Sequence, residues 1–319
     1  MSSECRTASS RWAAVGPFAV FAFAALVLGL FVPTVESAGA ADSTLVERVE
    51  SPYNDIYLHK MGNGYFVLTF GARRLHYTES IVNPKDETEL PVSYTRSMTV
   101  GVVYASGLSD AAMIGLGGGR TSWYLHKSIP GLKMSAAELD PEVVRIAEHY
   151  FGVKPQPDFE INTIDGRMYL VRTKQSFDLI LVDAYRGPFV PFHLLTREFF
   201  SLIKQRLNPG GVVIQNVEPN TMLFDSAVAT ISSVFKNLDF YKGEGNIVIV
   251  GYDGPLKDMA ELKRIAKERQ EKYHFRYDLS SLLDLRFHPE INWTKQPLTD
   301  DFAPVEYLRA IERHNAKQD

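Results

Sequence analysis

The segment "GLGGGRTSWYLHKSIPGLKMSAAELD", residues 115–140, carries the clearest structural pattern in this sequence. An apolar run that predicts a buried strand comes before it, and a predicted helix follows its four leading glycines, Gly115, Gly117, Gly118 and Gly119. Glycines at such a turn let main-chain N–H groups approach a ligand closely, with a helix N-terminus behind them. Glu138 ends the next predicted strand about twenty residues on, where a carboxylate can accept both hydroxyls of a ribose. The stretch therefore predicts a nucleoside site, and its spacing fits NAD and S-adenosylmethionine alike.

A cation, Arg120, stands directly after the glycines. A guanidinium in this place suits a carboxylate, which it can hold with two parallel hydrogen bonds. Ordinary S-adenosylmethionine carries such a carboxylate and its decarboxylated form does not. Arg120 is therefore predicted to bind the cofactor and to discriminate between these two compounds, unless its side chain turns out to solvent.

The sequence around this stretch alternates between strand and helix patterns. Apolar runs predict strands at 111–116, 133–139, 159–164, 177–183 and 212–217, with two closing strands within 238–252. Amphipathic stretches predict helices at 93–106, 121–129, 141–151, 195–207 and 221–236. Strands separated by helices imply a parallel sheet with right-handed crossovers, whose ligands bind at the carboxyl ends of the strands.

Further acidic residues fall at those strand ends. Asp165 and Gly166 follow the third strand, where the aspartate either accepts from an adenine amino group or caps a helix. Asp183 ends an apolar strand, and packing explains a carboxylate poorly at that point, so we expect it in the ligand crevice. Asp140 precedes Pro141 and is expected to be a helix N-cap.

The sequence pattern divides the chain into four parts. Residues 1–40 are unlike the rest, and residues 41–92 form a small β-hairpin domain, with "MGNG" at 61–64 as a hairpin turn. Residues 93–255 form the nucleoside-binding core, and residues 256–319 are expected to be a mostly helical extension.

The first forty residues have the pattern of a targeting segment. Two arginines precede about twenty uncharged, mostly apolar residues, and an Ala-Gly-Ala sequence follows at 38–40. A cleaved signal peptide and an uncleaved membrane anchor at 12–32 both fit. The charge bias places the remainder outside the cytoplasmic membrane, either exported to the periplasm or anchored, although a cytoplasmic location stays open.

Composition excludes several classes of function. The net charge of −4 argues against a nucleic-acid partner, because such proteins concentrate basic residues on one face. Cys5 is the only cysteine, which excludes a disulfide framework and leaves no thiol nucleophile in the core. The eight histidines show no spacing typical of metal ligands on a helix face, and we expect no metal. His193, in a predicted loop, is expected to be exposed to solvent or to touch substrate.

In this order, the motifs resemble the spermidine synthase family. The resemblance covers roughly residues 50–310 and is carried by the glycine loop, "AELDPEVVRIAEHYF" at 137–151, "FDLILVDAYRGPFVPFHLLTREFF" at 177–200 and "TDDFAPVE" at 299–306. It implies an α/β fold of the class I S-adenosylmethionine-dependent methyltransferase (Rossmann-like) type, with a parallel-rich sheet preceded by a small antiparallel β-domain. It also implies a decarboxylated S-adenosylmethionine co-substrate, an amine acceptor and a homodimer.

The sequence departs from the family pattern at two places. The family usually has an aspartate after the glycine loop, which holds the aminopropyl end of the co-substrate, where this chain has Arg120. The family gate motif usually reads Asp-Ser-Ser-Asp-Pro, whereas this chain keeps Asp183 and continues with Ala184, Tyr185 and Arg186. At both places, a family carboxylate that attracts a cation would be replaced by a guanidinium group, Arg120 or Arg186, that repels it.

Three functions follow as hypotheses. The first is a spermidine synthase-like transferase, in which an amine attacks a sulfonium carbon with Asp183 and Tyr185 as catalytic residues. The second is an S-adenosylmethionine-dependent methyltransferase with Arg120 on the carboxylate. The third is a non-catalytic exported protein that binds a ligand or a partner.

Overall fold

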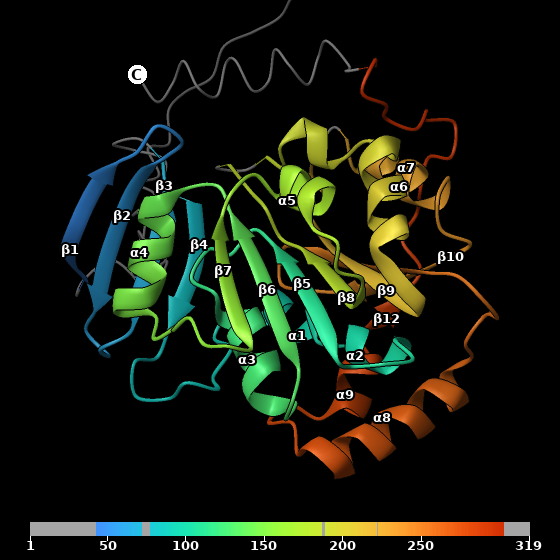
Figure 1. The fold of residues 1–319 in the computed structure, drawn as a ribbon, viewed down its shortest axis with the longest axis horizontal. Coiled ribbons are helices and arrows are strands. Elements are labelled where there is room, and N and C mark those ends of the chain that lie inside the picture. The colour runs from blue at the N-terminus through green and yellow to red at the C-terminus, as the bar shows by residue number, and fades with distance from the viewer. Residues whose placement is uncertain (1–42, 72–76, 187–188, 222, 303–319) are drawn as a thin grey trace, which may run out of the picture. The chain divides into compact units, whose positions relative to one another are not determined.

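The computed structural model describes residues 43–71, 77–186, 189–221 and 223–302, and its strands lie in two sheets (Figure 1). The first sheet is antiparallel, with its strands in sequence order. Its strands are β1 (Ser43–Glu50), β2 (Asp55–Met61), β3 (Phe66–Phe70) and β4 (Tyr77–Val82). The hairpin predicted around "MGNG" is confirmed between β2 and β3, with Gly64 at a positive φ of 89°. Residues 72–76, between β3 and β4, lie outside the described ranges.

The second sheet is mixed and contains the predicted nucleoside-binding core. Its order is β12-β10-β11-β9-β8-β5-β6-β7, in which the five strands from β9 to β7 are parallel and the others antiparallel. The strands are β5 (Asp110–Ile114), β6 (Lys133–Glu138), β7 (Phe159–Thr163), β8 (Phe177–Val182), β9 (Leu207–Val217), β10 (Asn237–Lys242), β11 (Ile247–Tyr252) and β12 (Arg286–Phe287). The predicted α/β fold with a parallel-rich sheet and a small antiparallel sheet before it is confirmed.

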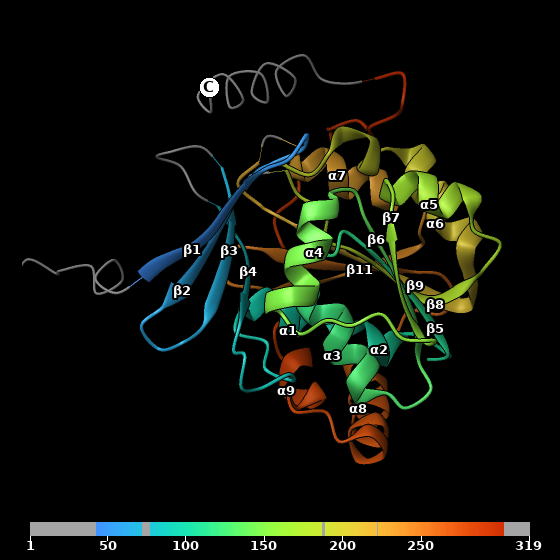
Figure 2. The ribbon, with the colours of Figure 1, turned by 60° about the vertical axis from the view of Figure 1, so that its left-hand side comes forward.

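Helices cover both faces of the second sheet (Figures 1 and 2). One apolar core unites the inward side chains of the first sheet with those of α1 (Ser93–Met98), α2 (Gly101–Tyr104), α3 (Arg120–Ser128), α4 (Pro141–Tyr150), α8 (Met259–Tyr273) and α9 (Leu279–Leu283). The other core lies under α5 (Gly166–Arg172), α6 (Arg197–Arg206) and α7 (Phe224–Ser232). Because β5, β6 and β8 are covered on both faces, they read as continuous apolar runs.

The second sheet has a longer β9 and one more strand, β12, than the sequence pattern indicated. The helix predicted at 195–207 ends at Arg206, and β9 begins at Leu207, five residues before the strand predicted at 212–217. Toward the C-terminus, residues 284–302 contain no helix, and β12 pairs with β10 at the sheet edge. Arg286 of β12 pairs with the buried carboxylate of Asp239, which explains why this short segment joins the sheet instead of extending the helical layer.

The predicted signal peptide or anchor, residues 1–40, lies outside the described residues. Within the part of the chain that the structure describes, none of the helices has the length and apolar character needed to cross a membrane.

Candidate functional site

The carboxyl ends of four parallel strands meet at one edge of the second sheet. The main-chain N–H of Gly115, after β5, donates to the carbonyl oxygen of Ala137 on β6 at 2.9 Å. The N–H of Asp183, after β8, donates to the carbonyl oxygen of Ile114 on β5 at 2.8 Å. The topology therefore brings the glycine loop together with the acidic residues that follow β6, β7 and β8.

Two cavities adjoin this edge. The large cavity has a volume of about 310 Å³, at the lower end of the range for small-molecule sites, and is lined in part by Gly117, Glu138, Asp165, Gly166, Asp183 and Tyr185. The small cavity has a volume of about 30 Å³ and is lined in part by Glu79, Tyr94, Thr95, Arg120, Asp183 and Tyr185. Glu79, Gly117, Asp183 and Tyr185 line both.

Gly115 permits the close packing on which this edge depends. Its φ of +84° is unfavourable for residues with a side chain, and a Cβ there would overlap the carbonyl oxygen of Asp183. The glycine loop can therefore lie directly against the end of β8. Gly117 also has a positive φ, but a Cβ there would meet open space, because this residue faces the cavities.

Glu138 supports the glycine loop as well as lining the large cavity. Its Oε2 accepts from the main-chain N–H groups of Leu116 at 2.8 Å and Gly117 at 3.2 Å, and its Oε1 accepts from the N–H of Asp140 at 3.1 Å. Burial raises the pKa of Glu138, although these hydrogen bonds oppose the rise. A carboxylate has about four acceptor positions, so one remains for a ribose hydroxyl. The contact between Glu138 and the ribose stays a prediction, and Glu138 can accept from one ribose hydroxyl instead of two.

Asp165 and Asp140 are both helix caps that also line the large cavity. The Oδ1 of Asp165 accepts from the N–H of Met168 at 2.9 Å, and its Oδ2 lies 2.7 Å from Nε2 of His193. Burial raises the pKa of Asp165, but the hydrogen bonds from His193 and Met168 outweigh this effect and hold it below its usual value. The predicted N-cap role of Asp140 is confirmed by its acceptance from Glu142 N–H at 3.0 Å.

Asp183 lies where the two cavities meet, held by two neutral donors. The Tyr94 hydroxyl donates to its Oδ2 at 3.1 Å, and the Asn216 side-chain amide donates to its Oδ1 at 2.8 Å. Burial raises the pKa of Asp183 to about 6, against the effect of these hydrogen bonds. A carboxylate with such a pKa can accept a proton near neutral pH.

Tyr185 and Arg186 of the altered gate motif differ in exposure. The Tyr185 hydroxyl donates to the carbonyl oxygen of Asn216 at 3.2 Å, and burial, with the charges of Asp183 and Glu218, raises its pKa well above 10. Tyr185 therefore stays protonated and acts as a hydrogen-bond donor. Arg186 is exposed at the rim of the large cavity and makes a main-chain bridge to Phe189.

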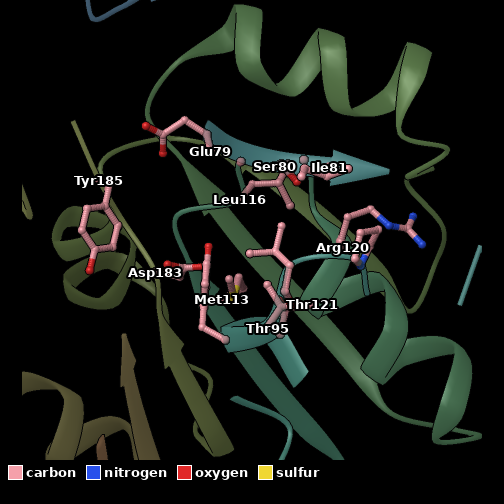
Figure 3. Close-up of a pocket in the computed structure, with 15 residues that line it drawn as sticks. Glu79, Ser80, Ile81, Thr95, Met113, Leu116, Arg120, Thr121, Asp183 and Tyr185 are labelled. Atoms are coloured by element: carbon pink, nitrogen blue, oxygen red, sulfur yellow. Dashed lines mark hydrogen bonds between the residues drawn. The ribbon is translucent and has the colours of Figure 1, made fainter. Parts of the chain in front are cut away.

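Arg120 does not turn to solvent. Its side chain is 4% exposed, and its guanidinium donates to the carbonyl oxygens of Phe151, at 2.9 Å, and of Glu87. Burial lowers its pKa to about 10. Figure 3 shows the guanidinium on the far side of the small cavity, directed away from Asp183. These contacts favour a structural role, and the predicted contact with a cofactor carboxylate has no support in this geometry.

Replacing Arg120 by Met tests the structural role. We expect the variant to lose about 2–3 kcal/mol of unfolding free energy, because the carbonyl groups of Phe151 and Glu87 lose charged donors. Chemical denaturation measures this loss. Calorimetry should give the same ratio of affinities for S-adenosylmethionine and its decarboxylated form as in the unchanged protein, and a shift of that ratio would restore Arg120 as a ligand for the carboxylate.

Sequence patterns did not identify three residues of this site. Glu79 lies on β4, Tyr94 on α1 and Asn216 near the end of β9. The pair Gln215-Asn216 interrupts an apolar strand, which is a usable signal for a functional position, whereas Glu79 and Tyr94 carry none. Neither residue comes near Asp183 until the first sheet and α1 pack on the core.

Within residues 43–71, 77–186, 189–221 and 223–302, no group of three or more His, Cys, Asp or Glu side chains is arranged to hold a metal ion.

Comparison with known proteins identifies the family. The family model for the spermine/spermidine synthase domain matches residues 106–242. A polyamine aminopropyltransferase of Vibrio vulnificus is 30% identical over 298 residues, which cover 89% of this chain and 98% of that relative.

Solved structures agree on the fold. A probable spermidine synthase from Corynebacterium glutamicum superposes with a TM-score of 0.65 at 20% identity, over 82% of this chain and 98% of that one. Human methyltransferase-like protein 13 superposes with a TM-score of 0.53 at 22% identity, over 57% of this chain and 92% of that one. The sequence match along nearly the whole bacterial relative shows that this chain belongs to the spermidine synthase family of polyamine aminopropyltransferases.

Proposed function

We propose that this protein transfers the aminopropyl group of decarboxylated S-adenosylmethionine to an amine acceptor. The observation that carries the proposal is the position of Asp183, a carboxylate bonded only to neutral donors, between the nucleoside-sized large cavity and the small cavity. Membership of the aminopropyltransferase family supports the same reaction.

The charges around the cavities favour a cationic ligand. Five carboxylates line them, those of Glu79, Glu138, Asp140, Asp165 and Asp183. Of the described Arg, Lys and His side chains in their lining, Arg120 is bonded to main-chain carbonyl groups, Arg186 is exposed at the rim, and His193 is paired with Asp165. Decarboxylated S-adenosylmethionine carries a sulfonium and an ammonium group and no carboxylate, so it matches this lining better than ordinary S-adenosylmethionine does.

The reaction needs few groups from the protein. The nitrogen lone pair of a neutral amine attacks the aminopropyl carbon next to the sulfonium, and the bond between that carbon and sulfur breaks to release methylthioadenosine. The nitrogen then carries an extra proton, which Asp183 accepts. Tyr94 and Asn216 hold the carboxylate in place, and Tyr185, which stays protonated, positions reactants by hydrogen bonding. Most of the rate would come from alignment of nitrogen and carbon.

A product assay tests the proposal. The purified full-length protein is incubated with decarboxylated S-adenosylmethionine and a panel of linear diamines, and mass spectrometry follows methylthioadenosine and the aminopropylated amine. We expect both products in equal amounts. Methylated amines formed from ordinary S-adenosylmethionine would instead indicate a methyltransferase, and binding of either compound without any product would indicate a non-catalytic protein.

The pH dependence of the same assay is a further prediction. Because the pKa of Asp183 is about 6 and its ionised form accepts the proton, kcat/KM should rise with pH through about 6 and then level off. Initial rates between pH 5 and 8 measure this, at a fixed concentration of the neutral amine. A rate that is level through this range would mean that Asp183 is not the proton acceptor.

A further inference from the structure

We propose that Glu79 binds the primary ammonium group at the end of the transferred aminopropyl chain and thereby selects the decarboxylated donor over S-adenosylmethionine. This inference rests on the proposed function and adds a specificity-determining residue to it. It assigns a ligand contact to the first sheet, which carries none of the predicted site residues.

Glu79 lies at the junction of the two cavities. It projects from the middle of β4 and lines both the large and the small cavity, as Asp183 and Tyr185 do. Figure 3 shows its carboxylate on the same side of the small cavity as Tyr185, with Arg120 at the opposite side. A chain that leaves the nucleoside pocket and passes Asp183 would therefore end near Glu79.

Glu79 differs from the other four carboxylates that line the cavities. Glu138, Asp140, Asp165 and Asp183 each accept two or more hydrogen bonds from neighbouring donors. The carboxylate of Glu79 has no hydrogen-bond or ion-pair partner among the residues that the structure describes. Glu79 is half-buried in the cavity wall. Enclosing an unpaired carboxylate costs free energy, and such groups cluster at functional sites.

The electrostatic surroundings of Glu79 favour a cation as its partner. Burial raises the pKa of Glu79 well above its usual value, and the charges of Asp183 and Glu138 raise it further. A cation placed beside it would relieve both the desolvation and the repulsion between these carboxylates. The tyrosines that face it, Tyr94 and Tyr185, have raised pKa values for the same reasons and stay neutral.

The charges of the small cavity restrict the ligand that enters it. Glu79 and Asp183 both line this cavity, so they attract an ammonium group. The carboxylate of ordinary S-adenosylmethionine would lie among Glu79 and Asp183 with like charge. Charge therefore selects the donor that lacks the carboxylate.

The test replaces Glu79 by Gln in the full-length protein and compares two ligands by calorimetry. Decarboxylated S-adenosylmethionine carries the ammonium group, and methylthioadenosine shares its nucleoside but has no charged chain. We expect the variant to bind the first about ten- to a hundredfold more weakly and the second unchanged. Its preference for the decarboxylated compound over S-adenosylmethionine should shrink accordingly. Glu160→Gln, an exposed change on β7, should alter neither affinity.

The outcomes separate this inference from the proposed function. Equal weakening of both ligands would show that Glu79 only supports the fold of the site, and unchanged affinities for both would show that it binds nothing, so either overturns the inference. If the unchanged protein forms the aminopropylated product in either of these cases, the proposed function stands alone. If the unchanged protein does not bind the decarboxylated compound, both fail. Glu79→Asp, which keeps the charge, should retain part of the preference.

Discussion

Replacement of Asp183 by Asn should lower the turnover of the proposed transfer by about 10²- to 10⁴-fold. The amide has nearly the shape of the carboxylate but cannot accept the proton that the attacking amine loses. In Asn, an NH₂ group also replaces one of the two carboxylate oxygens that accept hydrogen bonds from Tyr94 and Asn216. The measurement is single-turnover formation of methylthioadenosine in quenched samples, because this reports on chemistry and not on product release.

The same replacement should make the folded protein more stable at pH 8. The pKa of Asp183 is about 6 in the folded protein and 3.8 when unperturbed, so the folded chain holds a proton that the unfolded chain has lost between these values. Stability therefore falls as pH rises from about 4 to about 6 and stays lower above that, by about 3 kcal/mol for this shift. Asn has no proton to lose and avoids this cost.

Denaturation at two pH values checks the effect on stability. The gain of Asp183→Asn should appear at pH 8 and vanish near pH 4, where Asp183 is protonated in the folded protein. Asp301→Asn, a change at an exposed position, should show neither the loss of turnover nor this pH-dependent gain. A variant that is inactive and also less stable at pH 8 would mean that Asp183 mainly maintains the structure of the site.

Replacement of Glu138 by Ala should weaken the binding of methylthioadenosine by about 30- to 150-fold, or about 2–3 kcal/mol. Two causes act together. The predicted contact with the ribose is lost, and the N–H groups of Leu116, Gly117 and Asp140 lose their acceptor, so the glycine loop is no longer held in its ligand-binding shape.

Calorimetry with methylthioadenosine measures this loss, and two variants separate its causes. Glu138→Gln keeps an acceptor oxygen for part of the loop and should fall between the unchanged protein and the Ala variant. Glu148→Ala, at an exposed position of α4, should bind normally. An unchanged affinity in Glu138→Ala would refute both the ribose contact and the role in holding the loop.

The residues that the sequence identified share a simple geometric property. Gly115, Glu138, Asp165 and Asp183 all follow parallel strands, and the carboxyl ends of such strands must meet at one edge of the sheet. Periodicity shows where each strand ends, so the sequence predicts their meeting without any knowledge of tertiary contacts. The caps at Asp140 and Asp165 are local for the same reason, since each depends on a few neighbouring residues.

The direction of a long side chain is not a local property. The position of Arg120 at the start of α3 was evident from the sequence, yet nothing in the neighbouring residues shows that its guanidinium reaches the carbonyl groups of Phe151 and Glu87. Those partners lie about thirty residues away in either direction and are placed by tertiary packing. These contacts favour a structural role for the residue that was predicted to decide the choice of ligand.

Local sequence patterns are enough to predict the fold class, the glycine loop and the edge of the sheet at which a ligand is expected, because strand ends, turns and caps depend on short-range patterns. Which charges face that ligand depends on tertiary packing. Glu79 and Tyr94 reach Asp183 across about ninety or more residues, when the antiparallel sheet and α1 pack against the core. Burial then sets the pKa values of these groups, and burial is a property of the assembled fold and not of any segment of it.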